Sequence, residues 1–301
     1  MAGDTDHVLL TRFNLPSQGV ESFIRAKEGW LRDRIALFEL YCLPSVRAQT
    51  NQEFHWIIYF DPESPEWLKR RIQDHVGEGA YIPIFRSSVS KNDLIADIAR
   101  VTGGHGTRLI TTNLDNDDGL AIDFVERLQA VEPLQERTAV YLVRGLIKSE
   151  FRLYLRLDRH NAFGSVVENW TSPATAWADW HTLLGKSMRV LELHDEPGWL
   201  QVIHGANVSN RVRGRLVSPS RYVRLFPGLL DDVCIPESME MTIDILVARP
   251  RRLARDSGRA LAKGVAMRLL GKDGLYEAKT FWASRSGRYK LRRDKIATRD
   301  L

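Results

Sequence analysis

Cysteine is scarce in this chain. Its 301 residues include only Cys42 and Cys234, which are far apart in the sequence. Neither belongs to a Cys-x-x-Cys pair or to a Cys/His ligand spacing, which argues against a disulfide framework and against a zinc module. We therefore expect a reducing, cytoplasmic setting.

Long apolar runs are also absent. No stretch approaches the ~18 to 20 apolar residues that cross a bilayer, and residues 1–7 are acidic and polar rather than basic and then apolar. We expect neither a membrane-spanning helix nor a secretion signal. The hydrophobic content of 44% and the charged content of 27% are those of a globular protein, not of a disordered one.

Glycine-rich phosphate loops are missing as well. Gly103-Gly104-His105-Gly106 is not followed by Lys-Ser/Thr, and it precedes an expected strand instead of a helix. A Walker loop and a dinucleotide-binding loop both need a helix directly after the glycines. We interpret this segment as a plain turn.

Charge is unevenly distributed along the chain. Residues 249–301 hold 16 Lys and Arg against 5 Asp and Glu, a net +11, whereas residues 1–248 hold 27 against 33, a net −6. We therefore expect one domain over 1–248 and a basic extension over 249–301, which is either a solvated surface or a contact with an anionic membrane. Nucleic acid would attract the extension too, but the acidic body would repel it and no aromatic residues interleave with the basic ones.

Strands and helices alternate in the first half of the chain. Such alternation with short connections predicts an α/β fold, a Rossmann-type, mostly parallel sheet flanked by helices, with ligands at the carboxyl ends of the strands. The expected strands are 8–13, 54–60, 81–85 and 108–112. The expected helices are 30–45, ending at Pro44, then one capped by Ser64 with Pro65 in its first turn and running to about 75, and 92–101.

The second half has a mixed pattern. Residues 138–147 and 150–157 look like paired strands, 200–203 and 241–248 are further strand candidates, and 251–270 is an expected basic amphipathic helix. Trp170, Trp177 and Trp180 lie between them, either as a platform for an acceptor or as core residues.

Leu114-Asp115-Asn116-Asp117-Asp118-Gly119 directly follows the strand that ends near residue 112. Three carboxylates in four residues repel one another unless a cation offsets them, and Mg²⁺ and Mn²⁺ prefer such oxygen ligands. A diphosphate could complete the coordination. The alternative is a solvated turn that caps a helix beginning near Leu120.

A calcium loop, with Asp115, Asp117 and Glu126 in its first, third and twelfth places, is excluded because Gly119 comes one place too early and a strand precedes the loop.

Four segments of the chain resemble the putative rhamnosyltransferase family, within the wider GT-A glycosyltransferases. The resemblance spans roughly residues 8–215 and implies a GT-A-like fold, a nucleotide-sugar donor and an Asp-x-Asp element that holds Mn²⁺ or Mg²⁺. The segments are Leu10-Thr11-Arg12-Phe13-Asn14, residues 30–60, the acidic element through Leu120, and residues 199–207 with Trp199-Leu200-Gln201-Val202-Ile203-His204.

The resemblance also implies roles for single residues. Asp115 and Asp117 match the Asp-x-Asp element, with Asn116 beside them in the donor site, and His204 is the candidate for a third metal or diphosphate contact. An isolated histidine is more often structural, so this role depends on the resemblance alone.

Further site residues are expected around the donor. In GT-A enzymes the loop after the first strand and an acid after the second frame the base and the ribose, which carries over to Thr11, Arg12 and Asp61. An inverting enzyme needs a base that accepts the proton of the acceptor hydroxyl, and Asp195 and Glu168 are the candidates. Each could also be a plain surface carboxylate.

The function expected from these features is transfer of a sugar, such as rhamnose or another deoxyhexose, from a nucleoside diphosphate to a glycan or glycolipid acceptor at the cytoplasmic face of the membrane. A nucleotidyltransferase is the rival enzyme, but it would carry a glycine-rich loop after the first strand, and residues 11–17 contain no glycine. A non-catalytic nucleic-acid binder acting through the basic extension is the alternative from another class.

Overall fold

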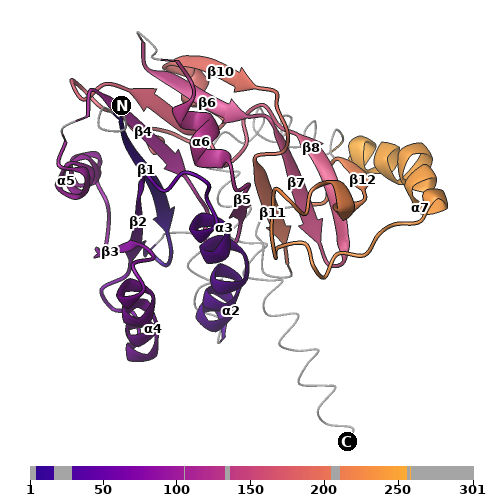
Figure 1. Cartoon of the computed structure of the whole chain (residues 1–301), viewed down its shortest axis with the longest axis horizontal. Coiled ribbons are helices and arrows are strands. Elements are labelled where there is room, and N and C mark those ends of the chain that lie inside the picture. The colour runs from indigo at the N-terminus through magenta and orange to yellow at the C-terminus, as the bar shows by residue number, and fades with distance from the viewer. Residues whose placement is uncertain are drawn as a thin grey trace, which may run out of the picture.

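The computed structural model describes residues 5–16, 29–104, 106–132, 136–204, 211–255 and 258. Two β-sheets lie side by side, and helices cover the larger one (Figure 1). The rest of the basic extension, and with it most of the helix expected over 251–270, lies outside the described residues, as do His105 and residues 205–207 of the family segment.

The larger sheet has seven strands in the order β10-β6-β9-β4-β1-β2-β3. Of its described strands, only β9 runs antiparallel to its neighbours. The predicted α/β fold with a mostly parallel sheet is confirmed. The strands are β1 (Thr5–Arg12), β2 (His55–Phe60), β3 (Ile82–Phe85), β4 (Arg108–Asn113), β6 (Thr138–Leu142), β9 (Ser165–Glu168) and β10 (Arg189–Leu193).

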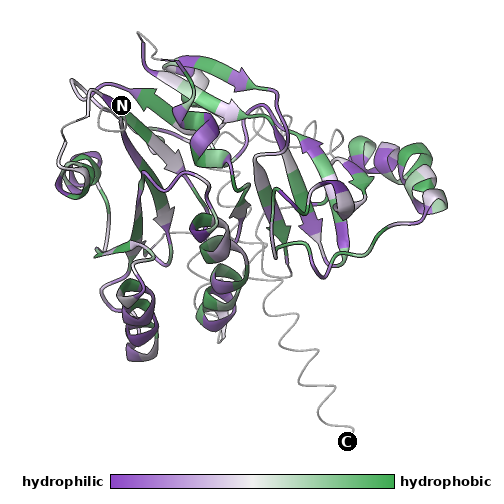
Figure 2. Cartoon of the chain, in the orientation of Figure 1, coloured by the Kyte–Doolittle hydropathy of each residue, from purple (hydrophilic) through white to green (hydrophobic). Residues whose placement is uncertain are grey.

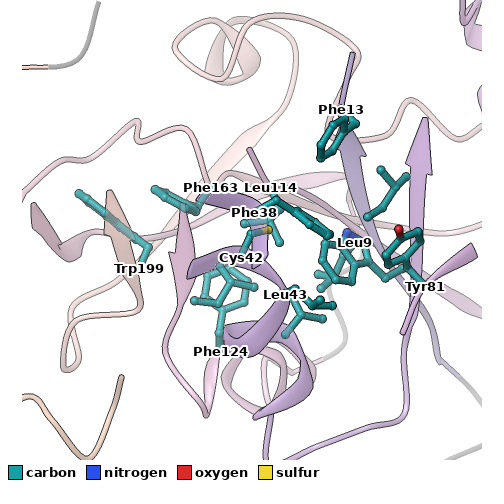
Figure 3. Close-up of a cluster of buried hydrophobic side chains, with 14 of the residues drawn as sticks. Leu9, Phe13, Phe38, Cys42, Leu43, Tyr81, Leu114, Phe124, Phe163 and Trp199 are labelled. Atoms are coloured by element: carbon teal, nitrogen blue, oxygen red, sulfur yellow. The ribbon is translucent and has the colours of Figure 1, made fainter. Parts of the chain in front are cut away.

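Helices pack on both faces of this sheet, as expected from the alternating pattern. On one face Leu9, Phe38 and Phe124 belong to a large core (Figure 3), and on the other Leu94 and Ile98 of α5 pack against the opposite sides of β1 and β2. The helical elements are α2 (Trp30–Leu37), the π-helical turn η1 (Phe38–Cys42), α3 (Leu43–Arg47), α4 (Glu66–Gly77), α5 (Lys91–Thr102) and α6 (Phe124–Gln129).

Two helix ends differ from the prediction. Pro44 does not end the helix that begins at Trp30; helical structure continues through the π-helical turn η1 and α3 to Arg47, with Pro44 near the start of α3. Ser64 does not cap α4, because its hydroxyl donates to the carbonyl of Asp61 at 2.7 Å and accepts from Asn14 at 2.9 Å. The serine holds the turn after β2 instead.

The smaller sheet has five strands in the order β12-β8-β7-β11-β5. The segment expected as one strand over 138–147 divides between β6 of the large sheet and β7 of the small one, whereas 150–157 and 200–203 are confirmed as strands. The strands are β5 (Gly119–Leu120), β7 (Arg144–Ser149), β8 (Arg152–Leu157), β11 (Trp199–Ile203) and β12 (Arg215–Val217).

The strand predicted over 241–248 is wrong. This segment is helical, with α7 (Ser238–Ile243) followed by the π-helical turn η4 (Asp244–Ala248), and the helix continues through Arg255. The β-branched run suggested a buried strand, but a strand needs a neighbouring edge, and here buried Asp244 accepts the N–H of Leu216 from β12 at 2.8 Å. Within the described residues, no helix has the length and apolar composition needed to cross a membrane.

His7 in β1 makes stability depend on pH. Burial, and then the charge of Arg108, lower its pKa from 6.5 to about 3. The unfolded chain therefore binds a proton that the folded one does not. The contribution of neutral His7 to the free energy of unfolding is complete above pH 6.5 and is lost as the pH falls toward 3. At pH 5 this lowers the free energy of unfolding by about 2 kcal/mol.

We predict that His7→Asn, which keeps an acceptor for the amide of Gln129, flattens the decline in unfolding free energy between pH 7 and pH 5. Urea unfolding of both proteins across this range measures it. Parallel pH curves for the two proteins would refute a neutral His7.

Candidate functional site

The acidic residues occupy the loop between β4 and β5. The N–H of Leu114 donates to the carbonyl of Leu10 at 3.0 Å, so the chain leaves the sheet beside the end of β1. The loop is not a solvated helix cap: α6 begins only at Phe124, and Asn116, Asp117 and Asp118 are 5%, 6% and 1% exposed. Burial on this scale requires partners for the polar groups.

Asn116 connects the acidic loop to the end of β1. Its amide donates to the carbonyl of Phe13 at 2.7 Å and to that of Arg12 at 3.3 Å, and its oxygen accepts from Arg34 at 3.1 Å. The Asn116 side chain therefore positions both the loop and a cation from α2.

Asp117 is the centre of the cluster. Its Oδ2 lies 2.7 Å from Nη1 of Arg34 and 3.0 Å from Nε2 of His204. Burial alone would raise the pKa of Asp117, but the hydrogen bond from His204 and the charge of Arg34 outweigh it and hold that pKa below its usual value. The structure thus brings together two residues that are 87 positions apart in the sequence.

Asp118 fastens β11 to the loop. Its Oδ1 accepts the N–H of Val202 at 2.8 Å, which places His204 two residues further on beside Asp117. Its Oδ2 is buried and has no hydrogen-bond partner in the described structure. Burial, followed by the charges of Asp117 and Asp115, raises the pKa of Asp118 well above its usual value.

Asp115 is the member of the cluster that reaches solvent. Its carboxyl is otherwise surrounded by protein, and this desolvation together with the charge of Asp117 raises its pKa to about 6. The amide of Asn113 approaches its Oδ1 at 3.4 Å. Asp115 is therefore the acid best placed to meet a ligand from outside.

The residues expected around base and ribose differ in their surroundings. The Thr11 hydroxyl is fully buried and accepts a hydrogen bond from Trp56 Nε1 at 2.9 Å, so its contact is with the core and not with a ligand site. The guanidinium of Arg12 lies 4.0 Å from the ring centre of Trp177, close to the acidic loop that its own carbonyl contacts. Asp61 accepts the N–H of Glu63 at 2.9 Å in the turn after β2.

The three tryptophans do not form one platform. Trp170 donates to Asp6 at 2.7 Å and Trp177 to Asn113 at 2.8 Å, and both pack on the core, whereas Trp180 is 72% exposed. Of the three, only Trp177 adjoins the acidic loop, through Asn113.

The structure does not bring Glu168 to the acidic cluster. In β9 this residue pairs with Leu109 near the start of β4, whereas the acids follow the end of β4. Its buried carboxylate receives the N–H groups of Ala174 and Thr175, each at 2.8 Å, and Arg137 at 2.6 Å. Glu168 is thus saturated by structural contacts.

Asp195 is also separated from the cluster. It is exposed in the turn that precedes β11, while His204 follows the other end of the same strand. Five strand residues at about 3.3 Å each keep the two apart.

Arg34 is a site residue that sequence reasoning missed. It lies in α2 with its guanidinium 5.2 Å from the ring centre of Trp30, and it contacts both Asn116 and Asp117. Nothing in the sequence separates it from Arg32, which lies instead over Trp67 at 4.7 Å. Only the fold shows which arginine faces the acids.

The cluster offers a partial set of metal ligands. Among the residues that the structure describes, no three His, Cys, Asp or Glu side chains are grouped so that they could hold a metal ion. Asp117 and His204 do meet; the carboxylate suits Mn²⁺ or Mg²⁺, whereas the imidazole is a softer ligand than Mg²⁺ prefers. Any remaining ligands would have to come from Asp115, from a bound diphosphate or from water.

Comparison with known families identifies the chain. The family described as "Putative rhamnosyl transferase" matches residues 6–216. The chain belongs to this family, and membership makes it a glycosyltransferase. No curated protein matches the chain in sequence.

Three solved structures show distant likeness. One, described as a putative nucleotide-diphospho-sugar transferase from Desulfovibrio desulfuricans G20, is 8% identical over 64% of this chain and 81% of its own, with a TM-score of 0.35. S. aureus TarS 1–349 in complex with UDP is 10% identical over 78% and 68%, at 0.35. The inositol-1-phosphate CTP transferase from T. maritima is 10% identical over 77% and 99%, at 0.38. None of the three is similar enough to bear on the chemistry of the site.

We predict that Glu168→Gln lowers the free energy of unfolding by about 2 kcal/mol, because an amide cannot accept from two N–H groups and a guanidinium as the carboxylate does. Nucleotide binding by the folded variant should match that of the wild type. Chemical unfolding and calorimetry measure the two quantities. Unchanged stability with lost turnover would instead make Glu168 catalytic.

Proposed function

We propose that the protein transfers rhamnose, or a related deoxyhexose, from a nucleoside-diphosphate donor to a glycan or glycolipid acceptor, with the help of Mn²⁺ or Mg²⁺. The observation that carries the proposal is the contact of Asp117 with His204 and Arg34 at the carboxyl end of β4. Acceptors of this kind are assembled at membranes, which fits a peripheral contact of residues 249–301 with anionic lipid.

The donor diphosphate is the group that this cluster suits. Ligands of mostly parallel sheets gather at the carboxyl ends of the strands, where the acidic loop lies. Arg34 contacts the loop from α2, and the charge of Arg12 at the end of β1 acts on Asp115, so both would supply positive charge for phosphate oxygens. Asn116 holds the end of β1 and the guanidinium of Arg34 in place. Its amide is occupied by these contacts, so Asn116 would support the donor site without binding the ligand itself.

A divalent cation fits the donor atoms present. Asp117 and His204 would hold it, and Asp115, which reaches solvent, would take part as the diphosphate binds. When bound, the metal would stabilise the charge that builds on the departing nucleoside diphosphate. Around it, Asp118 keeps β11, and therefore His204, in register with the loop.

We predict that Asp117→Asn abolishes metal-dependent binding of nucleoside diphosphates. Loss of a partner outside the ligand set costs ~10–100-fold in metal affinity, and loss of a ligand should cost at least as much. Calorimetry with UDP, dTDP and GDP, each with Mn²⁺, measures it. The exposed acid Asp231, changed to Asn, serves as the matched control and should bind normally. Equal heats for wild type and Asp117→Asn would reject the proposal.

A second prediction concerns Arg34, which shares Oδ2 of Asp117 with His204. A metal must compete with this guanidinium, so Arg34→Gln should bind Mn²⁺ alone more tightly, by about tenfold, since the competing charge is removed. The same variant should bind a nucleoside diphosphate less tightly in the presence of EDTA. Electron paramagnetic resonance of free Mn²⁺ measures the Mn²⁺ affinity, and calorimetry measures the affinity for the nucleoside diphosphate in EDTA. Changing Arg32 to Gln is the control, and identical Mn²⁺ affinities in wild type and Arg34→Gln would contradict the competition.

A further inference from the structure

The helical segment 238–255 is attached to the small sheet by polar groups. Glu240 pairs with Arg152 of β8 at 2.6 Å, and buried Asp244 accepts the N–H of Leu216. Arg252 donates to Asp244 at 2.7 Å and lies over Tyr154. The inner residues recur about every four positions, so one helix face turns toward the sheet. Its contacts with the sheet are made by polar groups, with Met241 and Ala248 half-buried beside them.

The outer face of the same segment is apolar. Met239 is 72% exposed, Leu246 is 70% exposed and Leu253 is 57% exposed. Figure 2 shows hydrophobic residues along this helix at the end of the molecule, beyond β8 and β12. A soluble helix normally buries its apolar residues and exposes its polar ones, so the reversed arrangement requires an apolar partner. The other exposed apolar residues of the segment are Ile243, Ile245 and Val247, with Ile235 just before it.

Positive charge accompanies the apolar face. Arg249, Arg251 and Arg255 are exposed in the same segment, and residues 249–301 carry a net +11. A partner that matches both features has a negatively charged surface with apolar material directly below it. An anionic lipid membrane is such a partner, since the boundary between headgroups and acyl chains accepts apolar side chains while the phosphates attract arginine.

We propose that the outer face of residues 238–255 inserts into the surface of an anionic membrane, with Met239, Leu246 and Leu253 as the inserting side chains. A second copy of the chain would bring the same positive charge against this face and be repelled. The remainder of the basic extension would be repelled by Arg249, Arg251 and Arg255 for the same reason. The inference rests on the membrane contact in the proposed function and extends it from charge to an inserted surface.

The test is sedimentation of the full chain with vesicles of phosphatidylglycerol and phosphatidylcholine, mixed in roughly a 1:3 ratio. The variant Met239→Gln/Leu246→Gln/Leu253→Gln keeps good helix formers while it removes the apolar groups. Its partition coefficient should fall about tenfold or more, and its residual binding should vanish at high salt. The wild type should keep part of its binding at high salt, because insertion of apolar groups is not screened.

Two controls separate the possible results. Leu157→Gln alters an exposed apolar residue at the far end of β8 and should bind vesicles as the wild type does. Arg249→Gln/Arg251→Gln/Arg255→Gln should weaken binding only at low salt. Calorimetry with a nucleoside diphosphate should give the same result for all these variants, which would show that the part of the chain around the acidic loop is folded in each.

The inference is overturned if the three-glutamine apolar variant binds vesicles as tightly as the wild type; binding that depends only on the arginines would leave the charge contact of the proposed function intact. No binding by the wild type would refute both the insertion and that contact. A wild-type dimer that the apolar variant converts to monomers in analytical ultracentrifugation would assign the face to a second copy instead.

Discussion

Neutralisation of three neighbouring acids at the end of β4 is the constraint on which the rest of the site depends. Carboxylates this close cannot all remain charged in a buried place without partners, and the three acids are stabilised in three different ways. Asp117 takes a guanidinium and an imidazole, Asp118 takes a backbone N–H and has its pKa raised, and Asp115 reaches solvent. Because these partners come from α2 and β11, the acids determine where both elements must lie.

The same contacts unite the two sheets. β5 follows the acidic loop directly and pairs antiparallel with β11, while Asp118 accepts from Val202 in that strand. The close fit extends to Gly119, where an added Cβ would lie 3.0 Å from a methyl group of Leu229. The small sheet is therefore attached to the acidic loop, and a shift of β11 would move His204 relative to Asp117. An acceptor contact on the small sheet could therefore act mechanically on Asp117 and His204, the proposed metal ligands.

The first half of the fold was predictable because its signals are local: apolar runs, turn residues and alternation define β1 to β4 and their parallel arrangement. The acidic loop was predictable for the same reason, as composition and position coincide there. The partners of the loop were not, because Arg34 differs from Arg32 only in its place on the helix. Glu168 and Asp195 were selected by chain region, which says nothing about which end of a strand they occupy. The helix over 241–248 was misread as a strand because its run of β-branched and apolar residues is typical of buried strands. In the fold most of these residues face outward, which reverses the usual relation between hydrophobicity and burial.

Charge balance gives an independent reason to expect a divalent ion. The body of the chain carries a net −6, and a nucleoside diphosphate is itself an anion, so an acidic loop would repel its own donor. Arg34 and His204 offset Asp117, but at Asp115 burial and the charge of Asp117 outweigh the charges of Arg34 and Arg12, and the pKa of Asp115 rises to about 6. A bound Mn²⁺ or Mg²⁺ would supply two positive charges where carboxylates and phosphate oxygens converge. In the proposed function the acids would not bind the donor themselves; they would bind the cation that makes donor binding favourable, and Arg34 would keep Asp117 neutralised until that cation binds.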